Sequence, residues 1–144
     1  MAETVAEYDT RYLGGILFFN LRDFFEAHEV WESIWLDCAG PERRFIQGLI
    51  QAAVALYHFG NGNLRGAAKL FKSGRAYMEA YESPYLGLDR QAFWEQMERC
   101  FQPLFADPNP DRQLRPDETL IPTITLDPPP AQWPAPEDFE TEED

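Results

Sequence analysis

The chain has 144 residues, of which 44% are hydrophobic and 15% aromatic, and it carries a net charge of −13. This size and composition suit one globular domain with a sizeable apolar core. The acidic balance argues against general nucleic-acid binding, which needs a basic surface. No run of about 18 apolar residues is present, so a membrane-spanning helix is not expected.

The N-terminal residues and the two cysteines bear on the compartment in which the protein is expected. Residues 1–10 are acidic and have no basic segment followed by an apolar run, so a signal peptide is not expected. Cys38 and Cys100 lie far apart and fit no metal-ligand or redox spacing. Two free thiols predict a reducing environment, and we therefore expect a cytoplasmic protein.

Five helices are predicted in the first 106 residues. Asn20, Asn63 and Asp89 are predicted to cap the second, fourth and fifth, and Pro41 to open the third. The predicted ranges are about 4–18, 20–38, 41–59, 63–82 and 89–101. Because the loops after the second and third helices are short, the second, third and fourth helices should be antiparallel neighbours.

The third predicted helix is apolar almost all round, which is typical of a helix in the middle of a bundle. Its small residues should let neighbouring helices approach closely; they are Gly48, Ala52, Ala53 and Ala55. The sequence therefore predicts an all-α fold, a compact multi-helical bundle of about five helices around a central apolar helix.

Acidic residues and prolines gather at the C-terminus. Between Asp107 and Asp144 lie 11 acidic residues, two basic residues and nine of the 12 prolines. This shift predicts a helical domain at 1–106 and an acidic, proline-rich tail at 107–144. The apolar run 119–126 is expected to lie extended against the body or a second subunit, whereas 133–144 is expected to be disordered.

A polar set on the second and third helices is the candidate functional site. At about 100° per residue, one stripe of the second helix should face the core, and it consists of Phe24, His28, Trp31 and Trp35. Glu32 lies one turn from His28 on the flank of this stripe, Glu29 lies further round, and Glu26 points outward. A second stripe, on the third helix, consists of Gln47, Gln51, Val54 and His58.

Because buried polar groups need partners, the two stripes are expected to face each other. One interpretation is a hydrogen-bond network that fixes how the helices pair. Another is a ligand-binding module, with a site formed by His28, Glu29, Glu32, Gln47, Gln51 and His58. A third is a metal-dependent hydrolase in which His28, Glu32 and His58 bind zinc, iron or manganese, although their spacing matches neither di-iron bundles nor the zinc-protease helix.

A weaker candidate is a basic stripe on the fourth helix, formed by Arg65, Lys69 and Lys72. Near a helix N-terminus such a stripe could hold a phosphate, a carboxylate or the acidic tail. The remaining hypothesis is an interaction protein without a small-molecule site. It would form a homo-oligomer through the tail or the outer helix faces, with no nucleic-acid or membrane partner.

Two segments resemble a known family. The runs 24–32 (FFEAHEVWE) and 45–55 (FIQGLIQAAVA), followed by His58, Gly62-Asn63 and Gly66-Ala67, resemble the bacterial and archaeal family called domain of unknown function 309. The resemblance covers about residues 18–82 and implies a small multi-helical fold. It implies no activity, and the proline-rich tail departs from it.

Overall fold

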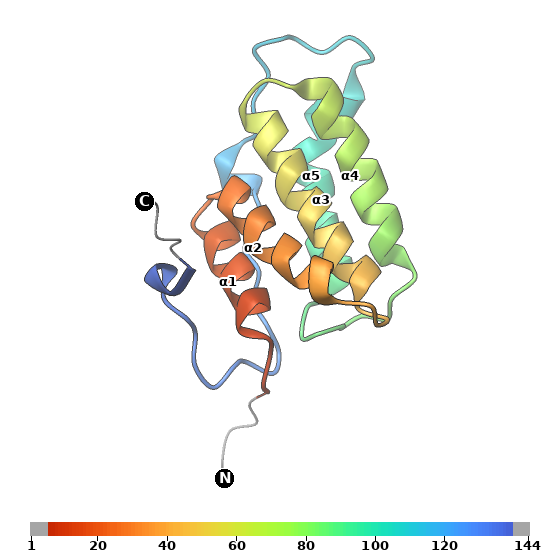
Figure 1. Cartoon of the computed structure of the whole chain (residues 1–144). Coiled ribbons are helices and arrows are strands. Elements are labelled where there is room, and N and C mark those ends of the chain that lie inside the picture. The colour runs from red at the N-terminus through yellow and green to blue at the C-terminus, as the bar shows by residue number, and fades with distance from the viewer. Residues whose placement is uncertain (1–5, 140–144) are drawn as a thin grey trace.

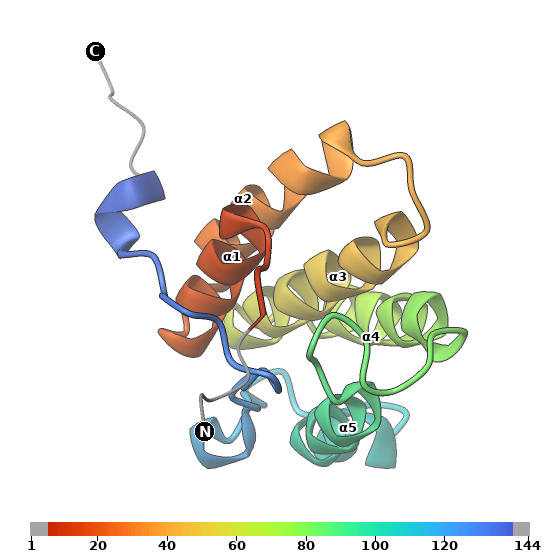
Figure 2. The same cartoon turned by 90° about the horizontal axis from the view of Figure 1, so that it is seen from below.

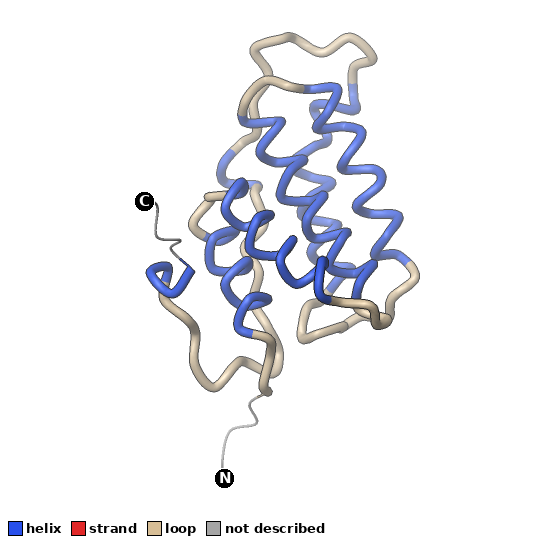
Figure 3. Tube along the Cα trace, in the orientation of Figure 1, coloured by secondary structure: helices blue, strands red, loops and turns tan. Residues whose placement is uncertain are grey.

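The computed structural model describes residues 6–139, and Figure 1 shows a bundle of helices in which α1 to α4 are joined by short loops and a longer loop leads to α5. The main helices are α1 (Thr10–Asn20), α2 (Phe24–Asp37), α3 (Arg43–Gly60), α4 (Leu64–Glu79) and α5 (Arg90–Ala106). Two short 3₁₀ turns follow in the tail, η1 (Glu118–Leu120) and η2 (Pro136–Phe139). Since no strand forms anywhere in residues 6–139 (Figure 3), the all-α prediction is confirmed.

Side-chain caps start four of the helices. Asp9, Asp23, Asn63 and Asp89 each accept a hydrogen bond from a backbone N–H two or three residues further on. The predicted caps Asn63 and Asp89 are confirmed. The predicted cap Asn20 is wrong, because the chain turns through Arg22 at φ 68° and α2 begins only after Asp23. Asn20 is instead the last residue of α1.

Helix α3 is the centre of the bundle, as predicted. It packs against α2 on one side and α4 on the other (Figure 2). Its buried face includes Ala52, Ala53 and Ala55, which are fully buried. At Gly48, a Cβ atom would overlap Met78 of α4 and lie 2.9 Å from the backbone oxygen of Gly74, so the two helices cross here with no room for a side chain. Small residues therefore set the α3–α4 distance.

Helix α5 is longer than predicted, since it continues past Pro103 to Ala106. Proline removes one backbone donor, and here that loss is offset by packing of the last turn. Leu104 is 5% exposed, and the Phe105 ring lies 5.1 Å from that of Phe71. None of the helices in the described part of the chain combines the length and apolar character needed to cross a bilayer.

The tail folds back onto the body. Figure 2 shows it crossing between α1 and α5, and Ile121, Ile124 and Leu126 are buried. The expectation of an extended apolar segment at 119–126 is confirmed for residues 121–126, which the chain's own body covers, whereas Thr119 and Leu120 belong to η1. Residues 136–139, expected to be disordered, form η2 and bring Phe139 against Phe18 at 6.0 Å between ring centroids. Residues 1–5 and 140–144 lie outside the described range.

Candidate functional site

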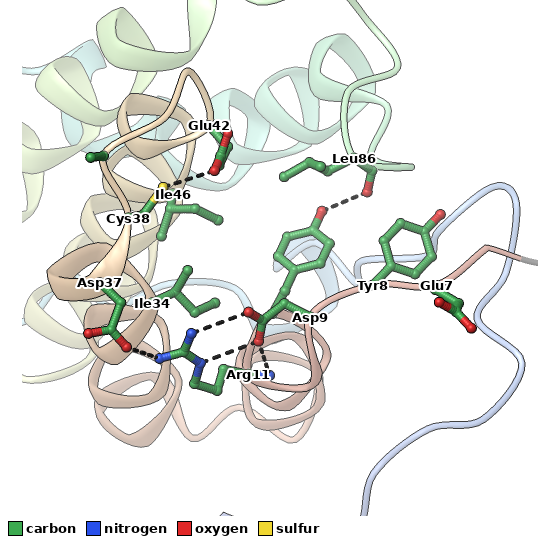
Figure 4. A pocket seen from close by; sticks show the side chains of 12 residues that line it. Glu7, Tyr8, Asp9, Arg11, Ile34, Asp37, Cys38, Glu42, Ile46 and Leu86 are labelled. Atoms are coloured by element: carbon green, nitrogen blue, oxygen red, sulfur yellow. Dashed lines mark hydrogen bonds and ion pairs between the residues drawn. The ribbon is translucent and has the colours of Figure 1, made fainter.

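A groove of about 410 Å³ opens where the start of α1, the end of α2 and the start of α3 meet. We call it the acidic groove. Its charged lining residues are four carboxylates and one guanidinium, namely Glu7, Asp9, Asp37, Glu42 and Arg11. Its apolar lining includes Tyr12, Ile34, Ile46 and Leu86. In Figure 4, Ile34 and Ile46 lie between Glu42 at one end and the Arg11 group at the other.

Arg11 joins two of the carboxylates. Its Nη1 donates to Asp37 Oδ2 at 2.7 Å and to the backbone oxygen of Ser33 at 3.0 Å, which ties α1 to α2. Its Nε donates to Asp9 Oδ1 at 3.3 Å. Burial opposes ionisation of Asp9, but the hydrogen bonds from Arg11 outweigh it, so the pKa of Asp9 lies below its usual value. The Asp9 carboxylate is therefore ionised near neutral pH.

Cys38 and Glu42 form a pair at the other end. The thiol donates to Glu42 Oε1 at 3.1 Å. Burial and this hydrogen bond raise the pKa of Cys38, whereas the same bond lowers the pKa of Glu42. The proton therefore stays on sulfur at neutral pH. A protonated thiol is a weak nucleophile, so the pair is arranged to present a carboxylate rather than an attacking thiolate.

Two tyrosines and the loop residue Leu86 form another side of the groove. The hydroxyl of Tyr12 donates to the backbone oxygen of Leu86 at 2.9 Å, and the hydroxyl of Tyr8 donates to that of Pro128 at 2.5 Å. The Tyr8 and Tyr12 rings lie 5.9 Å apart. The groove thus combines an apolar and aromatic lining with an excess of negative charge. That combination suits a ligand with a positive group and an apolar part.

The polar set predicted from the sequence is divided among different contacts. Gln47 accepts from Trp35 Nε1 at 3.1 Å, which is one link between the two predicted stripes. Gln51 turns the other way and accepts from the hydroxyl of Ser73 on α4. In place of the expected single network, Gln47 makes a hydrogen bond to α2 and Gln51 makes one to α4.

The two histidines lie at the edge of the core rather than inside it. The buried face of α2 consists of Ala27, Val30, Trp31 and Ile34. His28 is half-buried, and its Nδ1 lies 2.5 Å from the backbone oxygen of Phe25 while its Nε2 lies 3.6 Å from Glu32. His58 Nδ1 lies 3.4 Å from Asn63 Nδ2. The prediction that His28 lies within the core face is therefore wrong, because the buried face is centred between Ala27, Trp31 and Ile34 and leaves His28 at its edge.

The metal hypothesis gains no geometric support. Among residues 6–139, His, Cys, Asp and Glu side chains form no group of three or more that could hold a metal ion. His28 and Glu32 are neighbours on α2, but His58 does not complete a ligand set with them. Glu29 is exposed. A tetrahedral site needs at least three protein ligands around one point, so these residues do not provide one as they stand.

The histidines instead border an exposed aromatic cluster. Phe25 is 46% exposed and Tyr57 39% exposed, and their ring centroids lie 5.5 Å apart. His28 lies 4.9 Å from Phe25, and His58 lies 6.0 Å from Tyr57. We call these four residues the aromatic–histidine patch. It joins the N-terminal part of α2 to the C-terminal part of α3.

The basic stripe on α4 is a solvated face in this structure. Arg65, Lys69 and Lys72 are exposed. Lys72 Nζ lies 5.4 Å from the centre of the Phe105 ring. Nearby Arg75 pairs with Glu79 at 3.8 Å and with Glu98 at 3.6 Å. Surface pairs of this kind contribute little to stability.

The acidic groove was missed in the sequence because its residues come from distant parts of the chain. The predicted first helix, about 4–18, includes Asp9 and Arg11, whereas α1 begins at Thr10. An Asp directly before a predicted helical segment is a usual signal for an N-cap, and Asp9 directly precedes Thr10, the first residue of α1. Applying that signal would have put Asp9 and Arg11 at a helix end, where side chains can line a cleft.

Comparisons with known proteins agree with the sequence resemblance and add no activity. Residues 12–70 match the family described as Domain of unknown function (DUF309). Uncharacterized protein YpuF of Bacillus subtilis (strain 168) is 33% identical over 101 residues, which are 67% of this chain and 58% of that protein. An uncharacterized protein of Aquifex aeolicus (strain VF5) is 32% identical over 71 residues, which are 49% of this chain and 21% of that protein. The matches thus span less than two thirds of either relative, and no solved structure matches the chain.

Proposed function

We propose that this chain, which resembles a family without an assigned activity, is a binding module. Its acidic groove would take a ligand with a positively charged group. The observation that supports this is the excess of carboxylates over guanidinium around an apolar lining. The ammonium or guanidinium group would lie near Glu42, and the apolar part would lie along Ile34 and Ile46. This places the ligand at the opposite end of α2 from His28.

The groove can be tested with phenethylamine, which joins one ammonium group to one aromatic ring. We expect it to bind weakly and to shift the amide NMR signals of Ala39, Tyr12 and Ile46. 3-Phenylpropionate has a similar skeleton and the opposite charge, so it should cause much smaller shifts. Glu42→Gln should weaken phenethylamine binding about tenfold, since a charge-assisted hydrogen bond contributes about 1.5 kcal/mol or more.

The matched control is Glu29→Gln, which removes the same charge from an exposed site on the outer face of α2. It should leave the affinity within about twofold, because exposed charges more than a Debye length apart are screened. Since the Cys38 hydrogen bond lowers the pKa of Glu42, binding should persist below the usual pKa of a glutamate and weaken as the pH falls through the folded pKa. Equal shifts with both compounds would count against the proposal.

A second candidate function is supported by the aromatic–histidine patch, which suits a protein partner. Exposed aromatic residues are enriched at the energetic centres of interfaces. The carboxylates of Asp23, Glu26 and Glu29 lie on the same part of α2, and burial together with repulsion from Glu29 raises the pKa of Glu26. This acidic rim favours a partner with basic residues around an apolar anchor. It disfavours a second copy of this acidic chain at this face.

We expect Phe25→Ala combined with Tyr57→Ala to abolish binding of a protein partner that the unchanged chain retains from an extract of the native cells. The free energy of unfolding should change little, because both rings are partly exposed. Leu36→Ala is the control, since Leu36 is 69% exposed further along α2. The measurement is quantitative mass spectrometry of proteins retained by each variant at low and high salt. If the double variant and the control retain the same proteins, the patch is not the interface.

A further inference from the structure

Residues 121–130, here called the strap, run along the body between α1 and α5 (Figure 2). The surface that covers the buried side chains of the strap is here called its receptor groove. From Pro122 onward the residues of the strap alternate between covered and exposed: Ile124 and Leu126 are 3% and 8% exposed, whereas Thr123 and Thr125 are exposed. Such alternation is expected where an extended chain lies on an apolar surface. The groove therefore accepts a segment with apolar side chains at every second position.

The end of α1 recognises the backbone of the strap. Asn20 Nδ2 donates to the backbone oxygen of Ile124 at 2.9 Å, and the backbone N–H of Ile124 donates to Asn20 Oδ1 at 2.8 Å. One amide side chain thus satisfies both backbone groups of one strap residue. This resembles the way in which extended peptides are bound by backbone hydrogen bonds, with pockets for alternate side chains.

Two further contacts extend this recognition. Arg22 Nη1 donates to the backbone oxygen of Pro122 at 2.8 Å, and its Nη2 donates to that of Ile121 at 3.1 Å. At the other end, the backbone N–H of Asp127 donates to the oxygen of Gly87 at 2.9 Å. The receptor groove therefore has fixed hydrogen-bonding groups along the strap, in addition to its apolar surface.

The segment that joins α5 to the strap is long and lies mostly in solvent. Most of residues 107–120 are exposed, and the hydrogen bonds of Asn109, Gln113 and Arg115 stay within the segment. Fourteen extended residues can span about 46 Å. A linker of that reach can carry the strap to a neighbouring molecule as well as to its own body.

We propose that the receptor groove also accepts the strap of a second copy of this chain, which produces a strap-exchanged dimer. Every contact of the strap is then the same as in the monomer, and only its connection differs, as in domain swapping. Two copies each carry a net charge of −13, so their repulsion opposes exchange. Added salt screens this repulsion and should raise the dimer fraction.

The test uses two full-length variants, one with an altered receptor groove and the other with an altered strap. Asn20→Leu keeps the strap and removes the backbone recognition, whereas Ile124→Asp keeps the receptor groove and places a charge at the most buried strap position. Each variant alone should elute as a monomer. Mixed at about 0.5 mM each, they should form a 1:1 complex of twice the 16.7 kDa chain mass, because the strap of the first fits the groove of the second.

Thr125→Asp is the matched control for the strap, since it adds the same charge at an exposed position. Mixed with Asn20→Leu, it should form less complex than Ile124→Asp does, because its own strap still fills its groove. Two folded variants that remain monomeric when mixed would overturn the proposal.

If circular dichroism shows that either variant is unfolded, the unchanged chain decides the question. It is concentrated to about 1 mM in high salt, warmed to just below its melting temperature, cooled and analysed by size exclusion. A slowly dissociating dimer supports exchange, and elution as monomer alone overturns it.

Discussion

Trp31→Ala is expected to lower the free energy of unfolding by about 3–5 kcal/mol, the range for truncating a large buried aromatic side chain. Trp31 is fully buried, and its Nε1 donates to the backbone oxygen of Tyr12 at 3.1 Å. A Cβ atom on Gly15 would overlap the indole, so α1 packs directly on this ring. Truncation therefore leaves a cavity between α1 and α2 and removes the hydrogen bond from the indole to the Tyr12 carbonyl.

Equilibrium unfolding in urea measures this effect. Trp133→Ala is the control, because Trp133 is 40% exposed in the tail and its loss should change stability by no more than about 0.5 kcal/mol. Trp31→Phe separates the two contributions, since it keeps much of the volume and loses the hydrogen bond. If Trp31→Ala costs less than about 1 kcal/mol, the indole is not the contact that holds α1 on α2.

Helix order, the central position of α3 and two of the caps could be predicted because they depend on local signals. The apolar run from Phe45 to Phe59 continues around the whole helix, and only a helix covered by neighbours is stable with that pattern. Asn63 and Asp89 precede helical segments directly, and their short polar side chains satisfy backbone N–H groups at the first turn. Such features depend on residues close together in the sequence.

The orientation of α2 was harder to predict because large aromatic residues dominated the pattern. Phe24, Trp31 and Trp35 predict a face that includes His28, yet the fully buried residues of α2 are Ala27 and Trp31, and His28 lies at the edge. Helix α2 packs against both α1 and α3, so its covered surface is wide and extends from Ala27 to Trp31 and Ile34. Periodicity locates a buried face to within about one residue, which is not enough to decide whether His28 is buried.

The candidate site was harder still, since it depends on where separate elements meet. Asp37 lies at the end of α2 and Glu42 just before α3, while Leu86 comes from the loop before α5. No spacing in the sequence brings these residues together. The strap shows the same limit, because an apolar extended segment was predictable whereas its pairing with Asn20 was not.

A second large loss of stability is expected from a substitution where α3 and α4 cross. Gly48→Val is expected to lower the free energy of unfolding by about 3 kcal/mol, because the new side chain overlaps Met78 and approaches the backbone oxygen of Gly74. Met78 can move its side chain, but a backbone carbonyl moves only with its helix. The helices must therefore separate, which also strains the contact between Gln51 and Ser73.

Gly60→Val is the matched control in the same helix. Gly60 is the last residue of α3, and a Cβ atom there would have no neighbour within 4 Å, so the change should be within about 0.5 kcal/mol. Urea unfolding of both variants measures the difference. If Gly48→Val and Gly60→Val are equally stable, α4 adapts to the added volume by shifting as a unit. In that case packing elsewhere, rather than the glycine crossing, sets the position of α4 on the central helix.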